Sequence, residues 1–192
     1  MKRNPQYQIL IICTIFLQSC VSFKEGLKNP NPVSEVFVKS LNGTYRVWDL
    51  EREHWKSMEL WKYDDFFHEI DRKLLKDTLP WDTTITRKFQ LEVINKNKLQ
   101  VSYIKNDTVN RTRVIKANLK KDGYLYLKNK NVGFVLVPFI VGAIDVKQTR
   151  MGLNESGDLI FDVAKYRGGA LFFFIFLDWQ NSAYRKTYQR VK

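Results

Sequence analysis

The amino-acid sequence predicts a mainly β protein, an antiparallel meander of about eight strands that closes into a barrel. Two observations predict this fold class. Short segments in which apolar and polar residues alternate recur along the chain after residue 85, as expected for strands with one buried face. The connections between them carry Gly, Asn or Asp, the residue types that tight turns prefer. Closure of the meander removes sheet edges that would otherwise pair with other chains.

An export segment precedes the domain. The chain starts with the basic residues Lys2 and Arg3 and continues with an apolar stretch from Ile9 to Leu17. This stretch is too short for a membrane-spanning helix, which needs about 20 apolar residues. Residues 1–19 are therefore predicted to be a signal peptide that is removed from the mature protein.

The signal peptide ends in a lipidation motif. The run Leu-Gln-Ser-Cys at 17–20 resembles the bacterial lipobox, in which a large aliphatic and a small residue precede an acylated cysteine. The Cys20 thiol is a nucleophile that can form a thioether to diacylglycerol, and the acyl chains then hold the protein at the membrane. Cys13 is lost with the signal peptide, so the mature chain is expected to lack a disulfide. An ordinary secretory signal with an incidental cysteine is the alternative.

Residues 20–34 are predicted to form a lipidated tether, because this stretch is polar and broken by two prolines. An N-terminal arm packed on the domain is the alternative, since an apolar run follows at 36–38. Residues 35–192 are predicted to be a single β-barrel-like domain, which at this length can bury an adequate core.

The domain opens with an apolar and aromatic strand over 41–48, entered through Gly43. Apolar residues then recur at helical spacing between 54 and 77, which predicts a helical insertion that ends before Pro80. Its aromatic stripe is interpreted as a packing face rather than a ligand site.

Seven further strands are expected after the insertion. They are placed at 89–93, 99–103, 111–119, 124–128, 132–146, 158–165 and 170–177. Turns are expected at 95–98, at Asp122-Gly123, at 154–157 and at 167–169. The strands 132–146 and 170–177 are apolar on both faces, so the helical insertion or a partner must cover the second face.

Two resemblances extend these expectations. The lipobox, the tether and the opening Leu-Asn-Gly-Thr-Tyr at 41–45, followed by Leu60-Trp61, resemble small lipoproteins of Bacteroidota. The meander resembles a lipocalin barrel, where a glycine-aromatic element opens the first strand and a basic residue of the last strand packs across it. Gly43, Tyr45 and Arg185 are assigned to those places. The chain departs from the lipocalin pattern by its helical insertion and by lacking the usual Gly-x-Trp.

Catalytic chemistry finds little support in the sequence. His54 and His68 lie among acidic residues, but their spacing matches no metal cage, and a solvated helix face is the preferred interpretation. Acidic pairs such as Glu51 with Glu53, or Asp64 with Asp65, are common on surfaces. We assign no catalytic residue, no metal and no cofactor, and a non-enzymatic role is favoured over an envelope hydrolase.

The mature chain is basic. The full chain carries a net charge of +12 from 32 basic and 20 acidic residues, and loss of Lys2 and Arg3 lowers it to +10. Eight basic residues concentrate on two predicted hairpins, at positions 105, 111, 113, 116, 120, 121, 128 and 130. Anionic lipid head groups or polysaccharides suit such a surface, with a solvated basic face as the alternative. Nucleic acid is not expected as the partner of an exported protein.

Three Asp-Thr sequences resemble the aspartate-threonine-aliphatic pattern of O-glycosylation in exported Bacteroidota proteins. They place candidate modification sites at Thr78, Thr83 and Thr108.

Two functional hypotheses follow. The leading one is a membrane-anchored, non-enzymatic envelope lipoprotein whose barrel interior binds a small apolar ligand, lined by Tyr45, Trp48, Phe134, Phe161 and Phe173. The alternative is an interaction or assembly module that docks a partner protein at the membrane through the strand 170–177 or the helical insertion. A ligand binder requires an internal cavity, whereas a docking module requires a filled barrel and an exposed apolar patch. Val21 is not an acidic retention signal, which favours the outer membrane.

Overall fold

The computed structural model describes residues 23, 27–50, 66–70, 86–137, 141–171 and 175–191. A short 3-10 helix, η1 (Val38–Leu41), precedes the first strand, and one short helix, α2 (Phe66–Ile70), lies between the first two strands. The eight strands are β1 (Gly43–Asp49), β2 (Arg87–Asn95), β3 (Lys98–Lys105), β4 (Thr108–Leu119), β5 (Leu125–Val137), β6 (Val141–Leu153), β7 (Leu159–Leu171) and β8 (Ile175–Arg190). The protein is therefore mainly β.

The strands form one antiparallel meander whose ends meet. Each strand pairs with the next in sequence, and β1 returns to β8 through the pairs Tyr45↔Arg190 and Asp49↔Tyr188. The predicted antiparallel meander of eight strands, arranged in a closed ring, is confirmed. Most of the predicted helical insertion at 54–77 lies outside the described residues, which include only α2 from that stretch.

The predicted strand boundaries are wrong in the second half of the ring. The chain reverses within 132–146 and again within 170–177, because Val137 pairs with Val141 and Leu171 pairs with Ile175. The predicted turn at 167–169 lies inside β7, where only the register against β8 shifts. The sequence between the paired residues is Pro-Phe-Ile at 138–140 and Phe-Phe-Phe at 172–174, so Pro138 is the single turn signal and the usual Gly, Asn and Asp are absent.

The turn at Asp122-Gly123 was predicted correctly and fixes the N-terminal segment. Gly123 has a φ of +73°, which favours glycine, and the Tyr124 amide donates to the Asp122 carboxylate at 3.1 Å. A Cβ at Gly123 would lie 2.6 Å from the Cα of Pro32. Glycine is therefore required both by the turn and by the close approach of residues 32–33, whose Val33 amide donates to the Gly123 carbonyl at 3.1 Å.

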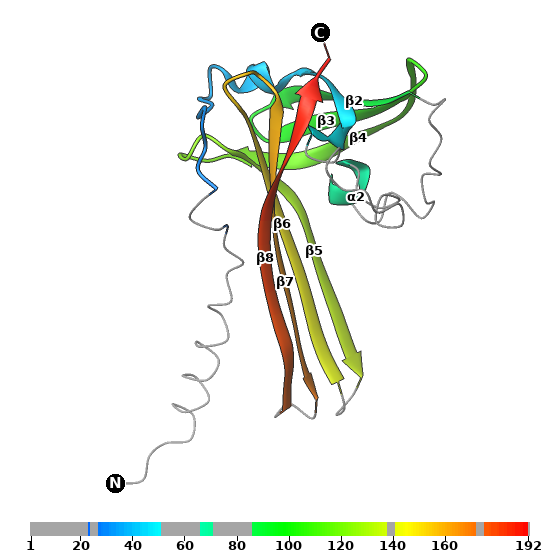
Figure 1. Ribbon diagram of the computed structural model, residues 1–192, viewed down its shortest axis with the longest axis vertical. Coiled ribbons are helices and arrows are strands. Elements are labelled where there is room, and N and C mark those ends of the chain that lie inside the picture. The colour runs from blue at the N-terminus through cyan, green and yellow to red at the C-terminus, as the bar shows by residue number, and fades with distance from the viewer. Residues whose placement is uncertain are drawn as a thin grey trace.

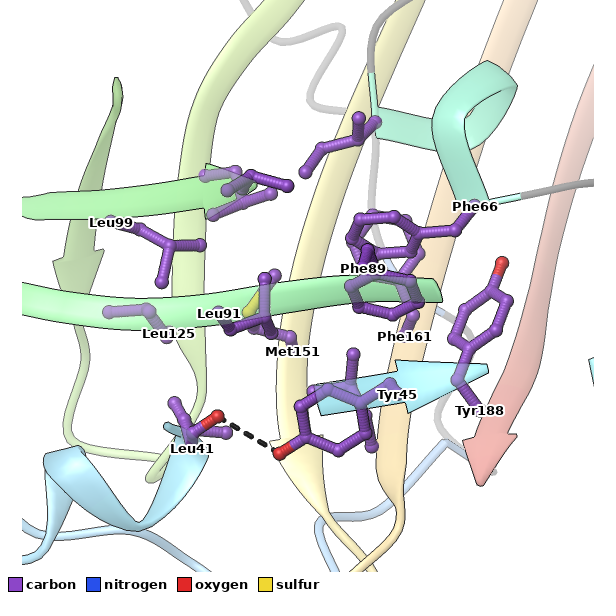
Figure 2. Close-up of a cluster of buried hydrophobic side chains, with 14 of the residues drawn as sticks. Leu41, Tyr45, Phe66, Phe89, Leu91, Leu99, Leu125, Met151, Phe161 and Tyr188 are labelled. Atoms are coloured by element: carbon purple, nitrogen blue, oxygen red, sulfur yellow. Dashed lines mark hydrogen bonds between the residues drawn. The ribbon is translucent and has the colours of Figure 1, made fainter. Parts of the chain in front are cut away.

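The inside of the ring is filled by aromatic and aliphatic side chains (Figure 2). Phe66 of α2 stacks on Phe89 with their ring centroids 3.6 Å apart, and Tyr188 packs edge-on against both rings. All three side chains are fully buried. The short helix α2 therefore closes the ring interior by inserting an aromatic side chain between β2 and β8.

Four strands continue past the ring (Figure 1). β4 pairs with β5 only at residues 125–127, and β1 reaches β8 only at Tyr188 and Arg190. Strands β5 to β8 extend beyond these pairs as a four-stranded sheet. We call residues 128–137, 141–148, 164–171 and 175–183 the projecting sheet. At a rise of about 3.3 Å per residue, the ten residues of β5 in it span roughly 33 Å.

Within the described residues, no helix is long and apolar enough to cross a membrane.

Candidate functional site

The projecting sheet changes from polar to apolar residues at nearly the same level on its four strands. Asp145 of β6 pairs with Gly133 of β5 and with Arg167 of β7, which in turn pairs with Gln180 of β8. Beyond this row, toward the end of the sheet, β5, β6 and β7 contain only apolar residues and glycine, and β8 does so after Trp179 and Asp178, which lie between Gln180 and Leu177. These residues are 133–137, 141–144, 168–171 and 175–177. We call them the apolar end of the projecting sheet.

The apolar end does not show the alternation of a half-buried sheet. Successive residues of a strand face opposite sides, so an uninterrupted apolar sequence supplies apolar residue types to both faces. The end is five residues long on β5, or about 17 Å, close to the roughly 15 Å depth of one leaflet of bilayer hydrocarbon. Apolar residue types on both faces distinguish this end from the usual antiparallel sheet with one solvated face.

A buried ion cluster lies where the ring passes into the projecting sheet. Glu69 of α2 is 6% exposed and accepts hydrogen bonds from Lys147 of β6 at 2.7 Å and from the Tyr184 hydroxyl at 2.8 Å. Lys186 and Lys165 approach the same carboxylate at 3.2 and 3.9 Å. Burial alone would raise the pKa of Glu69, but the surrounding lysines, Lys147 foremost, hold it below its ordinary value. The cluster fixes α2 to three strands at the base of the projecting sheet.

A second charged cluster holds the N-terminal segment against the ring. Asp162 lies between the core residues Phe161 and Val163 and so faces away from the core, yet it is fully buried. It accepts hydrogen bonds from the Arg150 Nε at 2.9 Å and from the Arg185 Nε at 2.7 Å. Both guanidinium groups are thereby oriented by a single carboxylate.

The two arginines use their remaining donors on the N-terminal segment. Arg150 donates to the Leu27 carbonyl at 2.6 Å, and Arg185 donates to the Lys28 carbonyl at 3.0 Å. The ring of Phe23 lies 4.1 Å from the Arg150 guanidinium and packs edge-on against Tyr126. We call Phe23 and residues 27–33 the N-terminal arm; it contacts both of the arginines that bind Asp162.

Burial raises the pKa of the Tyr124 hydroxyl in this cluster to about 12, with the nearby Asp162 carboxylate contributing. The hydroxyl therefore stays protonated at neutral pH. It donates to the Leu27 carbonyl at 3.3 Å and accepts from Arg185 at 2.6 Å, which adds a further link between the arm and the sheet.

The seam between the first and last strands is closed by Arg190, not by Arg185. The Arg190 guanidinium lies 5.3 Å from the centroid of the Tyr45 ring and donates to its hydroxyl at 2.7 Å. It also donates to the Ser40 and Asn42 carbonyls at the end of η1. The assignment of Arg185 to this place was wrong, because Arg185 faces the arm and binds Asp162, and Arg190 is the basic residue that β8 brings opposite Tyr45.

The residues predicted to line a ligand cavity are distributed between two regions. Tyr45 and Phe161 are fully buried in the ring core, and Trp48 is partly buried against it. Phe134 belongs to β5 within the projecting sheet, where it pairs with Ile144, seven residues beyond the last β5 residue that pairs with β4. Its side chain, and the whole of Phe173, lie outside the described residues.

Other predicted positions have simple placements. Cys20, His54, Thr78 and Thr83 lie outside the part of the chain that the structure describes, and His68 belongs to α2 without a described side chain. Thr108 is exposed at the start of β4.

No protein-family model matches the chain, and no curated protein or solved structure does either.

Proposed function

We propose that this protein is a non-enzymatic lipoprotein of the bacterial cell envelope that acts as an assembly module at the membrane, with the projecting sheet as its docking part. One observation carries this proposal: four strands leave the ring together, and their sequences become continuously apolar within two residues of the same level. A contiguous apolar surface of this kind is characteristic of an interaction site rather than of a surface in water.

The packed ring favours docking over the binding of an apolar ligand. The meander and the contact of Arg190 with Tyr45 support a lipocalin-like barrel. However, Phe66 and Phe89 stack in its interior at 3.6 Å, and Phe161 packs against Phe66. A ligand would have to displace these buried rings, at the cost of the core that they form. The ring is therefore proposed as a scaffold that holds the projecting sheet.

The position of the N-terminal arm supports a lipid anchor at Cys20 as part of the same site. Cys20 lies three positions before Phe23, so an extended chain carries the Cys20 backbone at most about 11 Å from the Phe23 backbone. Phe23 itself is fixed on Arg150 of β6. Lipidation at Cys20 would therefore place the membrane surface close to β6 instead of leaving the domain on a long tether.

The dimensions of the anchor and the projecting sheet agree. Arg150 and Asp145 are five residues apart on β6, or about 17 Å. The maximum reach of residues 20–23, about 11 Å, and a head-group layer of roughly 6 Å add up to the same distance. With the sheet directed into the membrane, hydrocarbon begins where the apolar end begins. Trp179 of β8 follows Asp178 at this level, and tryptophan is enriched at membrane interfaces.

The proposal is tested by lipid labelling and native gel electrophoresis of the full chain in its own host. Labelled palmitate is expected to enter the wild type and not Cys20→Ala. The wild type, extracted in mild detergent, is expected to migrate as a complex larger than one chain. The double variant Val135→Asp with Leu171→Asp is expected to migrate as a single chain.

A control separates docking from misfolding. Val114→Asp places the same charge on β4, where Val114 is already half exposed, and is expected to leave the complex intact. Thermal unfolding of the extracted variants checks that the ring is folded in each. A wild type without palmitate, or a double variant that still enters the complex, would overturn the proposal.

A further inference from the structure

Among the residues that the structure describes, the projecting sheet has two edges without a paired strand. Within the described residues, no strand pairs with residues 128–137 of β5 on the side away from β6, or with residues 175–183 of β8 on the side away from β7. Each edge presents a row of backbone N–H and C=O groups. The edges are long, and both end in the apolar part of the sheet.

Open edges are costly in either environment. In water, a long apolar edge strand pairs with other chains. In hydrocarbon, backbone groups without hydrogen-bond partners are so unfavourable that open sheet edges do not occur facing lipid. The proposed docking function therefore requires a partner that supplies strands to both edges.

We infer that this partner is a second copy of the same chain, with β5 of one copy paired to β8 of the next, so that several copies close one continuous sheet whose apolar ends lie in the membrane. This inference rests on the proposed docking function and names its partner. Closure around the assembly leaves no open edge on any copy.

Strand direction favours this pairing over a symmetric one. β5 runs toward the apolar end and β8 runs away from it. The arm places the anchor of every copy on the same side, so all sheets enter the membrane in the same direction. Under that constraint β5 and β8 of neighbouring copies are antiparallel, as all other pairs in the sheet are. Pairing β5 with β5 would instead be parallel, or would direct the two apolar ends oppositely.

Charge favours the same choice. Lys128 is exposed on the β5 edge, and a parallel β5–β5 pair in register would bring it opposite the Lys128 of the other copy, which is destabilising. The β8 edge instead offers the exposed, uncharged residues Gln180, Asn181 and Ser182 near this level. A β5–β8 pair therefore avoids the repulsion.

The apolar residue types on both faces also distinguish the closed sheet from a water-filled membrane barrel. The lumen of a water-filled membrane barrel is lined by polar residues that alternate with apolar ones. The apolar end lacks that alternation, so its inner face is expected to contact acyl chains or apolar groups and not a column of water.

Engineered cysteines test the pairing in the intact membrane. Lys128→Cys is combined in turn with Gln180→Cys, Asn181→Cys and Ser182→Cys in the full chain. Within one copy, the two edges are separated by three strand spacings, about 14 Å, which exceeds the roughly 7 Å that a disulfide allows between Cα atoms. Any disulfide formed must therefore join two copies.

The expected result is a ladder of disulfide-linked dimers, trimers and larger species in at least one double variant, with each single variant remaining monomeric. Co-expressed copies with two different affinity tags are expected to co-purify in detergent, and Val135→Asp with Leu171→Asp to abolish that co-purification. Val114→Cys on β4 serves as the control for random collision.

Each other outcome overturns the inference. Dimers from Lys128→Cys alone would show symmetric β5–β5 pairing. Failure of the tagged copies to co-purify while the native-gel complex persists would show that a different protein covers the edges, and the docking function would stand. Absence of both the complex and the co-purification would overturn the docking function as well.

Discussion

The ring of Phe23 packs on Arg150, with the ring centroid 4.1 Å from the guanidinium carbon. Phe23 lies three positions after Cys20, the residue predicted to carry lipid. Through this contact the N-terminal segment packs on the folded domain. With the proposed lipid on Cys20, the contact would also limit how far the ring stands from the membrane, because the chain between Phe23 and Cys20 reaches about 11 Å at most.

The stability of the arm depends on Asp162. Asp162→Ala leaves Arg150 and Arg185 without their shared carboxylate while the arm still covers them. Loss of one member of a buried ionic group costs about 3–5 kcal/mol, so we expect a free energy of unfolding lower by an amount of that order. Urea unfolding of the detergent-extracted protein measures it.

The matched control for Asp162 is Asp107→Ala, which breaks the pair with Lys88 at 2.9 Å. The Asp107 side chain is 79% exposed, and exposed pairs contribute about 0–1 kcal/mol. Similar losses for the two substitutions would show that the cluster does not hold the arm as described.

The cluster around Glu69 predicts a stability change in acid. Its pKa in the folded protein lies below the ordinary value of 4.5, so its charge stabilises the fold above that value, and this contribution is lost as the pH falls through the lowered pKa. Glu69→Gln is therefore expected to be less stable than the wild type at pH 7, with the difference narrowing below about pH 4.5. Urea midpoints measured at pH 7, 5 and 4 check the sign. A difference that widens in acid would contradict it.

The stacked pair Phe66 and Phe89 is expected to dominate the ring core. Phe66→Ala removes a fully buried ring that contacts β2, β7 and β8, and we expect a loss of about 3–5 kcal/mol, because a large cavity remains. Ile94→Ala on β2 is the control, since Ile94 is 45% exposed and is expected to cost little. Equal urea midpoints for the two variants would contradict a packed ring interior.

The sequence predicted the class of fold because its strands alternate and most of its turns carry recognisable residues. Asp122-Gly123 illustrates this, since both its glycine and its aspartate have the roles that the turn requires. The reversal after Leu171 is not predicted because its sequence is apolar throughout, and the reversal after Val137 carries Pro138 as its single turn signal within an apolar run. Each continuous apolar run therefore predicts one strand, whereas the structure has the end of one strand and the start of the next.

The clusters around Glu69 and Asp162 were harder to foresee. Both carboxylates stand next to apolar residues, so each sequence position is compatible with a solvated outer face. Their partners come from segments distant in sequence, β6 to β8 in the case of Glu69 and the arginines of β6 and β8 in the case of Asp162. The local pattern of apolar and polar residues indicates which side of a strand a residue faces, but not which distant segment packs against that side.

The central claim, that the apolar end of the projecting sheet is withdrawn from water, is tested most directly by labelling single cysteines along β6 in intact membranes. Gln148→Cys lies between the row of Asp145 and the ring, and Ala143→Cys lies in the apolar end. With a water-soluble maleimide, we expect Gln148→Cys to react and Ala143→Cys to be protected until the membranes are dissolved and the protein is unfolded. Equal labelling of both positions in intact membranes would contradict the claim.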